Sequence, residues 1–378
     1  MSVSDLAEKI ARLKRFLEQD ENNLNLLLDL GRALHESGQP EDAVSLFDRA
    51  LKIAADHPQA IYERSMVMIT LGRVEEAVAG FSQLKTAGLS HPSISYNLGY
   101  CYLLQSAPDK AVVELSEHIE EPAKNSGYAL VLARAYYAMG DLPEVERFVN
   151  LALSLQPDFL EAKAVLAMCL QDNEDFDKAI GMAEEVLAQD PDNAEALGVK
   201  AYCSLNVLDL STAAQSFDAM IQAKPKSGRG WVGKGLLEMQ QGDLAAAEGA
   251  LKKGLENMPG HIGSWNVLAW CQILQGRMQE AEESLGRASE IDDRFGETYG
   301  ALAVIKALTQ DYAEARLLAR KATRLDKDSF SGHFARALCD QGENNPEQAQ
   351  QIMHRLMNAP IDDKGRKLID ILPQFIRH

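Results

Sequence analysis

Five cysteines carry the most reactive side chains in this chain, and they recur at a fixed interval. Neighbouring members of the set Cys101, Cys169, Cys203, Cys271 and Cys339 are separated by 34 residues or by twice that number. A disulfide needs Cα atoms within about 7 Å, and zinc–sulfur bonds are about 2.3 Å long. Equivalent positions on stacked helices lie roughly 8–10 Å apart. We therefore expect five buried free thiols in a reducing compartment, and no redox or metal site.

Other motifs that could perform catalysis are missing. His57, His91 and His261 are also separated by multiples of 34, which places them in equivalent loops that are poorly placed to share a metal ion. The sequence has no P-loop, no G-x-G-x-x-G after a strand, no H-E-x-x-H, no C-x-x-C and no G-x-S-x-G. We expect no enzymatic activity, no catalytic residue and no cofactor.

The 34-residue interval organises the sequence from residue 24 to residue 360. Ten copies follow one another without insertion, with starts at 24, 58, 92, 126, 160, 194, 228, 262, 296 and 330. Position 20 of each copy is alanine except for Val145, and position 8 is always Gly, Ala or Ser. Large apolar residues at positions 4, 7 and 24, with a glycine at position 15 of several copies, indicate two helices joined by a turn. The copy at 262–295 shows the pattern through Trp265, Leu268, Gly276 and Leu285, and we expect Trp265, at position 4, to be a core residue.

This spacing of large and small residues resembles the tetratricopeptide repeat (TPR), a helix-turn-helix unit of the same length. The resemblance implies an all-α fold, a right-handed superhelical α-solenoid of ten TPR units with terminal capping helices. We expect residues 1–23 to form an N-terminal capping helix, residues 24–360 the ten repeats, and residues 361–378 a C-terminal solvating helix. Pro373 should end or kink that last helix, which leaves docking of the segment elsewhere as the alternative.

Composition narrows the choice of partners. The net charge of −18 and the pI near 4.9 argue against nucleic acid or an anionic membrane as the main partner. No signal peptide and no apolar run long enough to span a membrane is present, so we expect a cytoplasmic location and no membrane insertion. Residues 141–195 are the most acidic stretch, which we interpret as a solvated face; a docking surface for a basic partner is the alternative.

The TPR resemblance also implies where a ligand binds, because the first helices of the family line a concave groove through positions that include 5 and 9. At those positions and beside them we select an aromatic patch in repeats 2–4, with two further residues in later repeats. The candidate partner-binding residues are Tyr62, Met66, Tyr96, Tyr100, Arg134, Tyr137, Tyr202 and Trp270. Tyr, Trp and Arg are enriched at binding hot spots. The alternative is that several of these side chains only pack between neighbouring first helices.

These observations favour a non-catalytic protein–protein interaction scaffold, an adaptor or chaperone that binds a peptide or helix of another protein in an apolar and aromatic groove. The alternative function is a self-assembling scaffold that forms homo-oligomers through its terminal helices.

Overall fold

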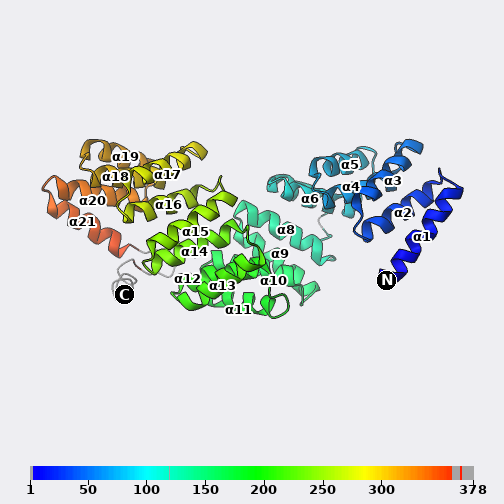
Figure 1. Ribbon diagram of the computed structural model, residues 1–378, viewed down its shortest axis with the longest axis horizontal. Coiled ribbons are helices and arrows are strands. Elements are labelled where there is room, and N and C mark those ends of the chain that lie inside the picture. The colour runs from blue at the N-terminus through cyan, green and yellow to red at the C-terminus, as the bar shows by residue number, and fades with distance from the viewer. Residues whose placement is uncertain (1–2, 119, 360–366, 368–378) are drawn as a thin grey trace. The chain divides into compact units, whose positions relative to one another are not determined.

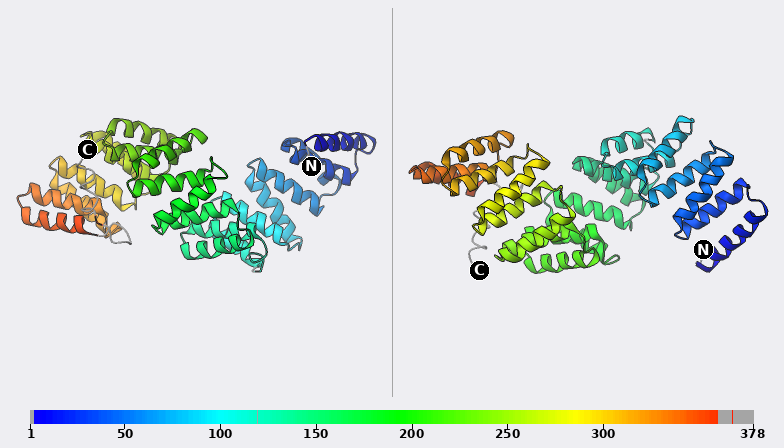
Figure 2. Two further views of the ribbon diagram at one scale, coloured as in Figure 1. Left: turned by 90° about the horizontal axis from the view of Figure 1, so that it is seen from below. Right: turned by 45° about the horizontal axis from the view of Figure 1, so that its top comes forward.

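The computed structural model describes residues 3–118, 120–359 and 367, and this part of the chain is helical throughout, with no β-strand. It contains 21 α-helices and one short 3-10 helix. Contacts divide the chain into two units, residues 1–169 (unit 1) and 170–378 (unit 2), which are described separately. Within each unit, helices alternate between the first and the second helix of successive repeats (Figures 1 and 2). The expected all-α solenoid of helix-turn-helix units is confirmed.

Unit 1 begins with α1 and continues through four helix pairs. Its elements are α1 (Val3–Gln19), α2 (Leu24–Glu36), α3 (Pro40–Ile53), α4 (Pro58–Thr70), α5 (Val74–Thr86), α6 (Pro92–Leu104), α7 (Pro108–Leu115), η1 (Ser116–His118), α8 (Ser126–Met139) and α9 (Leu142–Leu155). Helix α10 (Leu160–Asp172) contains the boundary between the two units.

Unit 2 continues the same alternation. Its elements are α11 (Phe176–Leu187), α12 (Ala194–Asn206), α13 (Leu210–Ala223), α14 (Gly228–Gln240), α15 (Leu244–Asn257), α16 (Ile262–Leu274), α17 (Met278–Ile291), α18 (Gly296–Leu308), α19 (Tyr312–Leu325), α20 (Phe330–Gly342) and α21 (Pro346–Asn358).

Each first helix, from α2 to α20, begins at the residue that the 34-residue register places first. The residue before it often caps its free N–H groups: Asn23 accepts from the Leu26 amide, and Ser227 accepts from the Gly230 amide. The turn that follows needs a left-handed residue at position 15 in all ten repeats. Five repeats place glycine there, as at Gly276, and five place another residue, as at Leu208 with φ 64°.

The core of each repeat forms where the small residues at positions 8 and 20 let the two helices approach. Residues at both positions are buried in all ten repeats. At position 8, Gly31 lies against the ring of Phe47 at position 24, and a Cβ added to Gly31 would be 2.7 Å from that ring. Gly99 faces Leu115 in the same way, at 2.7 Å. Small and large residues therefore interlock within each pair, as the spacing predicts.

Unit 1 departs from the regular series of helix pairs in its third repeat and at its N-terminus. The second helix of repeat 3 is short, because α7 has only eight residues and is followed by η1. Helix α1 packs on α2 and leaves Phe16 47% exposed. The C-terminal helix expected at residues 361–378 lies outside the described residues, apart from Lys367. The division into cap, repeats and solvating helix therefore stays a prediction.

None of the described helices has both the length and the apolar character that crossing a membrane requires.

Candidate functional site

The first helices of unit 1 border a hollow of about 730 Å³. Its lining is mainly apolar and aromatic and comes from α6, α8, the start of α10 and the residue before it: Tyr96, Tyr100, Leu103, Leu104, Leu130, Val131, Arg134, Ala138, Phe159 and Glu161. Three of the residues selected from the sequence, Tyr96, Tyr100 and Arg134, meet there. The hollow belongs to repeats 3 and 4 and the beginning of repeat 5, one repeat further along than the patch expected in repeats 2–4.

Tyr100 and Tyr96 contribute to this hollow in different ways. Tyr100, at position 9 of α6, is 39% exposed, so its ring is available to a partner. Tyr96, one turn earlier, is half-buried, and its ring centroid lies 6.1 Å from that of buried Tyr128 on α8. Burial, and then the neighbouring Tyr100, raise the pKa of the Tyr96 hydroxyl. Tyr96 therefore offers a neutral hydroxyl at the rim of the hollow across the physiological pH range.

Tyr62 and Met66 on α4 do not line the hollow. The Tyr62 ring packs edge-on against buried Phe81, with centroids 5.6 Å apart, and its hydroxyl accepts a 2.9 Å hydrogen bond from Asn97 Nδ2. Met66 is half-buried beside the same core. Tyr137 on α8 is half-buried against the core of repeats 4 and 5. These three side chains contribute to packing within unit 1.

Tyr202 and Trp270 lie in unit 2, and each contacts neighbouring helices there. The Tyr202 hydroxyl donates to the carbonyl oxygen of Arg229 at 2.8 Å, and the ring stands edge-on to Phe217 with centroids 5.1 Å apart. Trp270 is half-buried against apolar clusters of α16 to α20. Position 5, expected to line the groove, is buried in seven of the ten repeats. Position 9 reaches the surface more often, because only Val304 is buried there.

The cysteines and histidines have structural surroundings. All five cysteines are buried, and none of them is in a disulfide. Three histidines cap helices, because the Nδ1 atoms of His57, His91 and His261 accept from the backbone N–H groups of Ala60, Ser93 and Ser264. Among the described residues, no group of three or more His, Cys, Asp or Glu side chains is arranged to hold a metal ion.

A glycine-rich run at residues 228–235, GRGWVGKG, resembles a phosphate-binding loop by its letters alone. It lies inside helix α14. Added Cβ atoms would come within 2.0 Å of Phe217 at Gly233 and within 2.6 Å of Leu251 at Gly235. These glycines therefore allow helices to approach and do not form a loop around a ligand.

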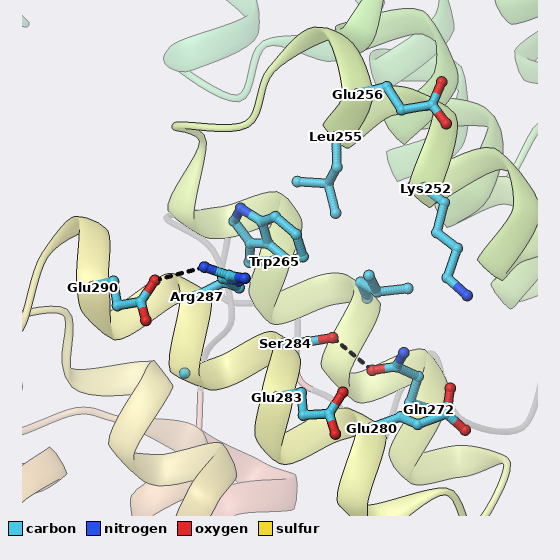
Figure 3. Close-up of a pocket in the computed structure, with 12 residues that line it drawn as sticks. Lys252, Leu255, Glu256, Trp265, Gln272, Glu280, Glu283, Ser284, Arg287 and Glu290 are labelled. Atoms are coloured by element: carbon cyan, nitrogen blue, oxygen red, sulfur yellow. Dashed lines mark hydrogen bonds and ion pairs between the residues drawn. The ribbon is translucent and has the colours of Figure 1, made fainter.

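Sequence reasoning missed a second hollow, of about 840 Å³, between α15, α16 and α17 (Figure 3). Trp265 forms part of its wall. We expected Trp265 to be a core residue, but it is only half-buried, because the second helices on either side leave its ring uncovered. The signal that the sequence offered was a glycine at position 286, which brings no side chain. In the structure, a Cβ added to Gly286 would have no atom within 4 Å.

Comparison with known proteins identifies the repeat. Family models described as tetratricopeptide repeat match residues 4–61, 34–88, 127–150, 165–228, 205–262 and 238–305, which together make up well over half of the chain. The TPR repeat-containing protein YpiA of Bacillus subtilis is 28% identical over 170 residues, 45% of this chain and 40% of that protein. Tetratricopeptide repeat protein 8 of Caenorhabditis elegans is 24% identical over 179 residues, 46% of this chain and 35% of that protein. The chain thus matches less than half of the length of these relatives.

Solved structures share the fold at low sequence identity. A human IFIT1 dimer with m7Gppp-AAAA aligns with a TM-score of 0.60 and 15% identity, covering 94% of each chain. The APC/C hetero-tetramer Cut9-Hcn1 aligns with a TM-score of 0.57 and 14% identity, covering 93% of this chain and 83% of the other. A tetratricopeptide repeat protein from Parabacteroides merdae covers 68% of this chain at 18% identity and a TM-score of 0.50. With the repeat register, the helix pairs and the family models in agreement, the chain belongs to the tetratricopeptide repeat family.

Proposed function

We propose that this protein is a non-catalytic, cytoplasmic adaptor or chaperone that binds an extended or helical segment of another protein in the hollow beside Tyr100. TPR proteins serve in general as protein-interaction scaffolds, and the family is typically non-catalytic. The single observation that supports this site is the hollow of about 730 Å³ in which Tyr96, Tyr100 and Arg134 meet an apolar wall. Five buried thiols, none of them in a disulfide, agree with a reducing compartment.

The chemistry of the hollow indicates an apolar segment with a polar group at its rim. Leu103 and exposed Leu104 offer apolar contact area, and the Tyr100 ring adds a large surface at low cost in side-chain entropy. Arg134 and Glu161 lie on the same lining and bring one charge of each sign. A segment with two or three apolar side chains at helical spacing fits this distribution.

Protein is a better partner than nucleic acid for this chain. One structural relative, human IFIT1, was solved with the capped RNA m7Gppp-AAAA, but at 15% identity that likeness extends to the fold alone. The present chain has a net charge of −18, which repels a phosphate backbone, and its hollow beside Tyr100 contains one arginine against one glutamate.

Photo-crosslinking tests the proposal. A photoreactive phenylalanine derivative is placed at position 100, and a matched control at Val113, which is 70% exposed on α7 but outside the hollow. In a native extract, position 100 should capture a discrete partner that position 113 does not. A synthetic peptide from the crosslinked region should then bind wild type and bind Tyr100→Ala more weakly. Equal capture at both positions, or equal peptide affinity, would refute this site.

Self-assembly through the terminal helices is the second candidate function, because α1 leaves the ring of Phe16 47% exposed. If that ring is an assembly contact, the mass measured by light scattering should rise with concentration and the rise should disappear in Phe16→Ser. A mass equal to one chain of 41.5 kDa at every concentration would exclude this candidate.

A further inference from the structure

A recurring ion pair links neighbouring repeats on the face formed by the second helices. In repeats 2, 6 and 7, a basic residue at position 7 of the first helix reaches an acidic residue at position 25 of the preceding repeat. The pairs are Arg64 with Asp48 at 2.6 Å, Lys200 with Glu184 at 2.8 Å and Lys234 with Asp218 at 2.5 Å. At these three junctions the long basic side chain reaches from a first helix to the second helix of the preceding repeat.

The junction between α15 and α17 lacks this pair. Position 7 of α16 is Leu268, and position 25 of the preceding repeat is Lys252, whose ammonium pairs with Glu248 on its own helix at 2.8 Å. Position 25 of the repeat that contains α16 is Gly286, which brings no side chain. The hollow of about 840 Å³ lies beside Leu268, at a junction where the position-7 residue is apolar and forms no such ion pair.

The acidic groups around this hollow exceed the basic ones. Four glutamates line it beside Lys252 and Arg287. Two of the four are paired, since Arg287 contacts Glu290 at 3.1 Å and Arg277 contacts Glu280. Glu256 and Glu283 form no ion pair or hydrogen bond within the described residues. In Figure 3 the Glu256 side chain on α15 lies above Trp265 and the Glu283 side chain on α17 lies below it. The hollow therefore has an uncompensated negative charge.

Trp265 presents a fixed aromatic wall to the same space. Its Nε1 donates a 2.8 Å hydrogen bond to the Pro259 carbonyl oxygen, which holds the ring in place. The preceding repeat shows what such a ring binds, because the Lys253 ammonium lies 4.3 Å from the ring centroid of Trp231, the residue equivalent to Trp265. Arg287 is the residue equivalent to Lys253, and it is bonded to Glu290 (Figure 3).

Gln272 supplies a hydrogen-bond donor to the wall of the hollow. Its side chain is only 3% exposed, and its Oε1 accepts a 2.8 Å hydrogen bond from the Ser284 hydroxyl. Its Nε2 donates no hydrogen bond within the described residues, and Figure 3 shows this nitrogen turned toward the hollow. This amide nitrogen is not among the buried side-chain atoms that lack a hydrogen-bond partner, so it is open to the hollow, where a peptide carbonyl oxygen of a protein ligand can accept from it.

We propose that this hollow binds an arginine or lysine side chain of another protein, with its charge attracted by Glu256 and Glu283, its stem along Trp265 and a backbone carbonyl accepting from Gln272 Nε2. The partner side chain would bring a basic group to a junction where Leu268 stands at the position that Lys234 has in the preceding repeat. This site lies on α15 to α17 of unit 2 and does not depend on the hollow beside Tyr100.

The test uses the peptide Ac-Gly-Arg-Gly-NH2 and its citrulline counterpart, which has the same shape without the charge. In NMR spectra of the 15N-labelled chain, the arginine peptide should shift the Trp265 indole N–H and the Gln272 side-chain amide, and leave the Trp231 and Trp270 indoles unchanged. The citrulline peptide should bind at least about fivefold more weakly, the loss expected when charge attraction is removed. Equal binding of the two peptides, or no shift at millimolar peptide, would overturn the proposal.

Two variants locate the binding. Glu256→Gln with Glu283→Gln should weaken arginine-peptide binding about fivefold. Leu268→Lys with Lys252→Asp recreates the Lys234–Asp218 pair inside the chain, so it should fold, as checked by its urea midpoint, and lose peptide binding. Retained affinity in either folded variant contradicts the site. Tyr100→Ala should leave peptide binding unchanged, so failure of this site and failure of the proposed function are separate results.

The basic residues Lys364, Arg366 and Lys367 of the chain itself provide the remaining control. If the arginine peptide binds only after these three are changed to glutamine, the occupant is the chain's own segment and the proposal of a partner protein is wrong. Equal binding with and without the change supports it.

Discussion

Asn97 Nδ2 donates a 2.9 Å hydrogen bond to the hydroxyl of Tyr62, joining the first helices α6 and α4 of neighbouring repeats. Asn97 is 5% exposed, so no solvent replaces this acceptor if it is lost. We predict that Tyr62→Phe keeps the ring contact with Phe81 but destabilises the protein by about 1–2 kcal/mol, because a buried donor becomes unsatisfied. Urea unfolding measures the change. The double variant with Asn97→Leu should recover much of the loss; a neutral Tyr62→Phe would show that the bond contributes nothing.

Binding and folding should separate at Tyr100. Its ring is 39% exposed, so Tyr100→Ala leaves no buried cavity and should change the free energy of unfolding by about 1 kcal/mol or less. Partner affinity should fall by about 2 kcal/mol or more if this ring is a hot spot. Phe81, fully buried, is the contrasting control, since Phe81→Ala should cost about 3–5 kcal/mol of stability. If Tyr100→Ala destabilises as strongly as Phe81→Ala, the ring is a packing residue.

The five cysteines should be inert in the folded protein. Burial raises the pKa of the Cys101 thiol to about 11, and burial followed by the nearby Asp172 raises that of Cys203 to about 12. Iodoacetamide at pH 8 should therefore leave all five unmodified until the chain is unfolded in urea, as intact mass will show. Rapid modification of three or more cysteines in the native state would contradict their placement at the buried position 10 of the repeat.

The same thiols predict a loss of stability at alkaline pH. Unfolded thiols ionise near pH 9, the ordinary value, whereas the buried Cys101 thiol keeps its proton to about pH 11. The unfolded state thus binds fewer protons in this interval, so the free energy of unfolding falls as pH rises from about 9 to about 11. Cys101→Ala should reduce the slope of this fall in urea midpoints measured between pH 8 and pH 11.

The sequence predicted the repeat with high precision, because packing within each pair is a local constraint that recurs. Ala at position 20, a small residue at position 8 and Cys at position 10 are all buried as expected. The start of each first helix also follows from the register, because each new pair must present the same face to the one before it.

The candidate sites were only partly predictable, because exposure depends on what the adjacent repeat places opposite a residue. Tyr62 and Tyr100 both stand at positions that were expected to line the groove. Tyr62 contacts Asn97 and Phe81, whereas Tyr100 stays exposed. The hollow beside Trp265 arises from the combination of Leu268, Lys252 and Gly286 on three helices. The position of each residue within its repeat does not by itself reveal that these three residues leave an empty space.

An ion-pair network around Glu248 predicts a loss of stability in acid. Burial opposes ionisation of the Glu248 carboxyl, but hydrogen bonds from Lys252, Arg277 and Gln275 outweigh it and lower its pKa from 4.5 to about 2. Its stabilising effect is present above pH 4.5 and is lost as pH falls toward 2. In urea unfolding, Glu248→Gln should be less stable than wild type at pH 7, and the gap should narrow at pH 3. A gap that stays constant with pH would exclude this charge as the cause.

Two glycines of the same repeat should respond in opposite directions to the same substitution. A Cβ at Gly235, position 8 of α14, would lie 2.6 Å from Leu251 Cγ and 3.1 Å from the Ala247 carbonyl oxygen, so the two helices would have to separate. Gly249 on α15 has no atom within 4 Å of an added Cβ. Removing a glycine from a helix interior stabilises by up to about 1 kcal/mol, whereas overpacking a filled core costs about 1–3 kcal/mol.

We therefore predict that Gly249→Ala raises the free energy of unfolding by about 0.5–1 kcal/mol, and that Gly235→Ala lowers it by about 1 kcal/mol or more despite the same gain in helix propensity. Urea unfolding of the two variants beside wild type measures both effects. If Gly235→Ala is as stable as Gly249→Ala, the helix pair can widen at little cost. Position 8 is then small for a reason other than its contact with position 24.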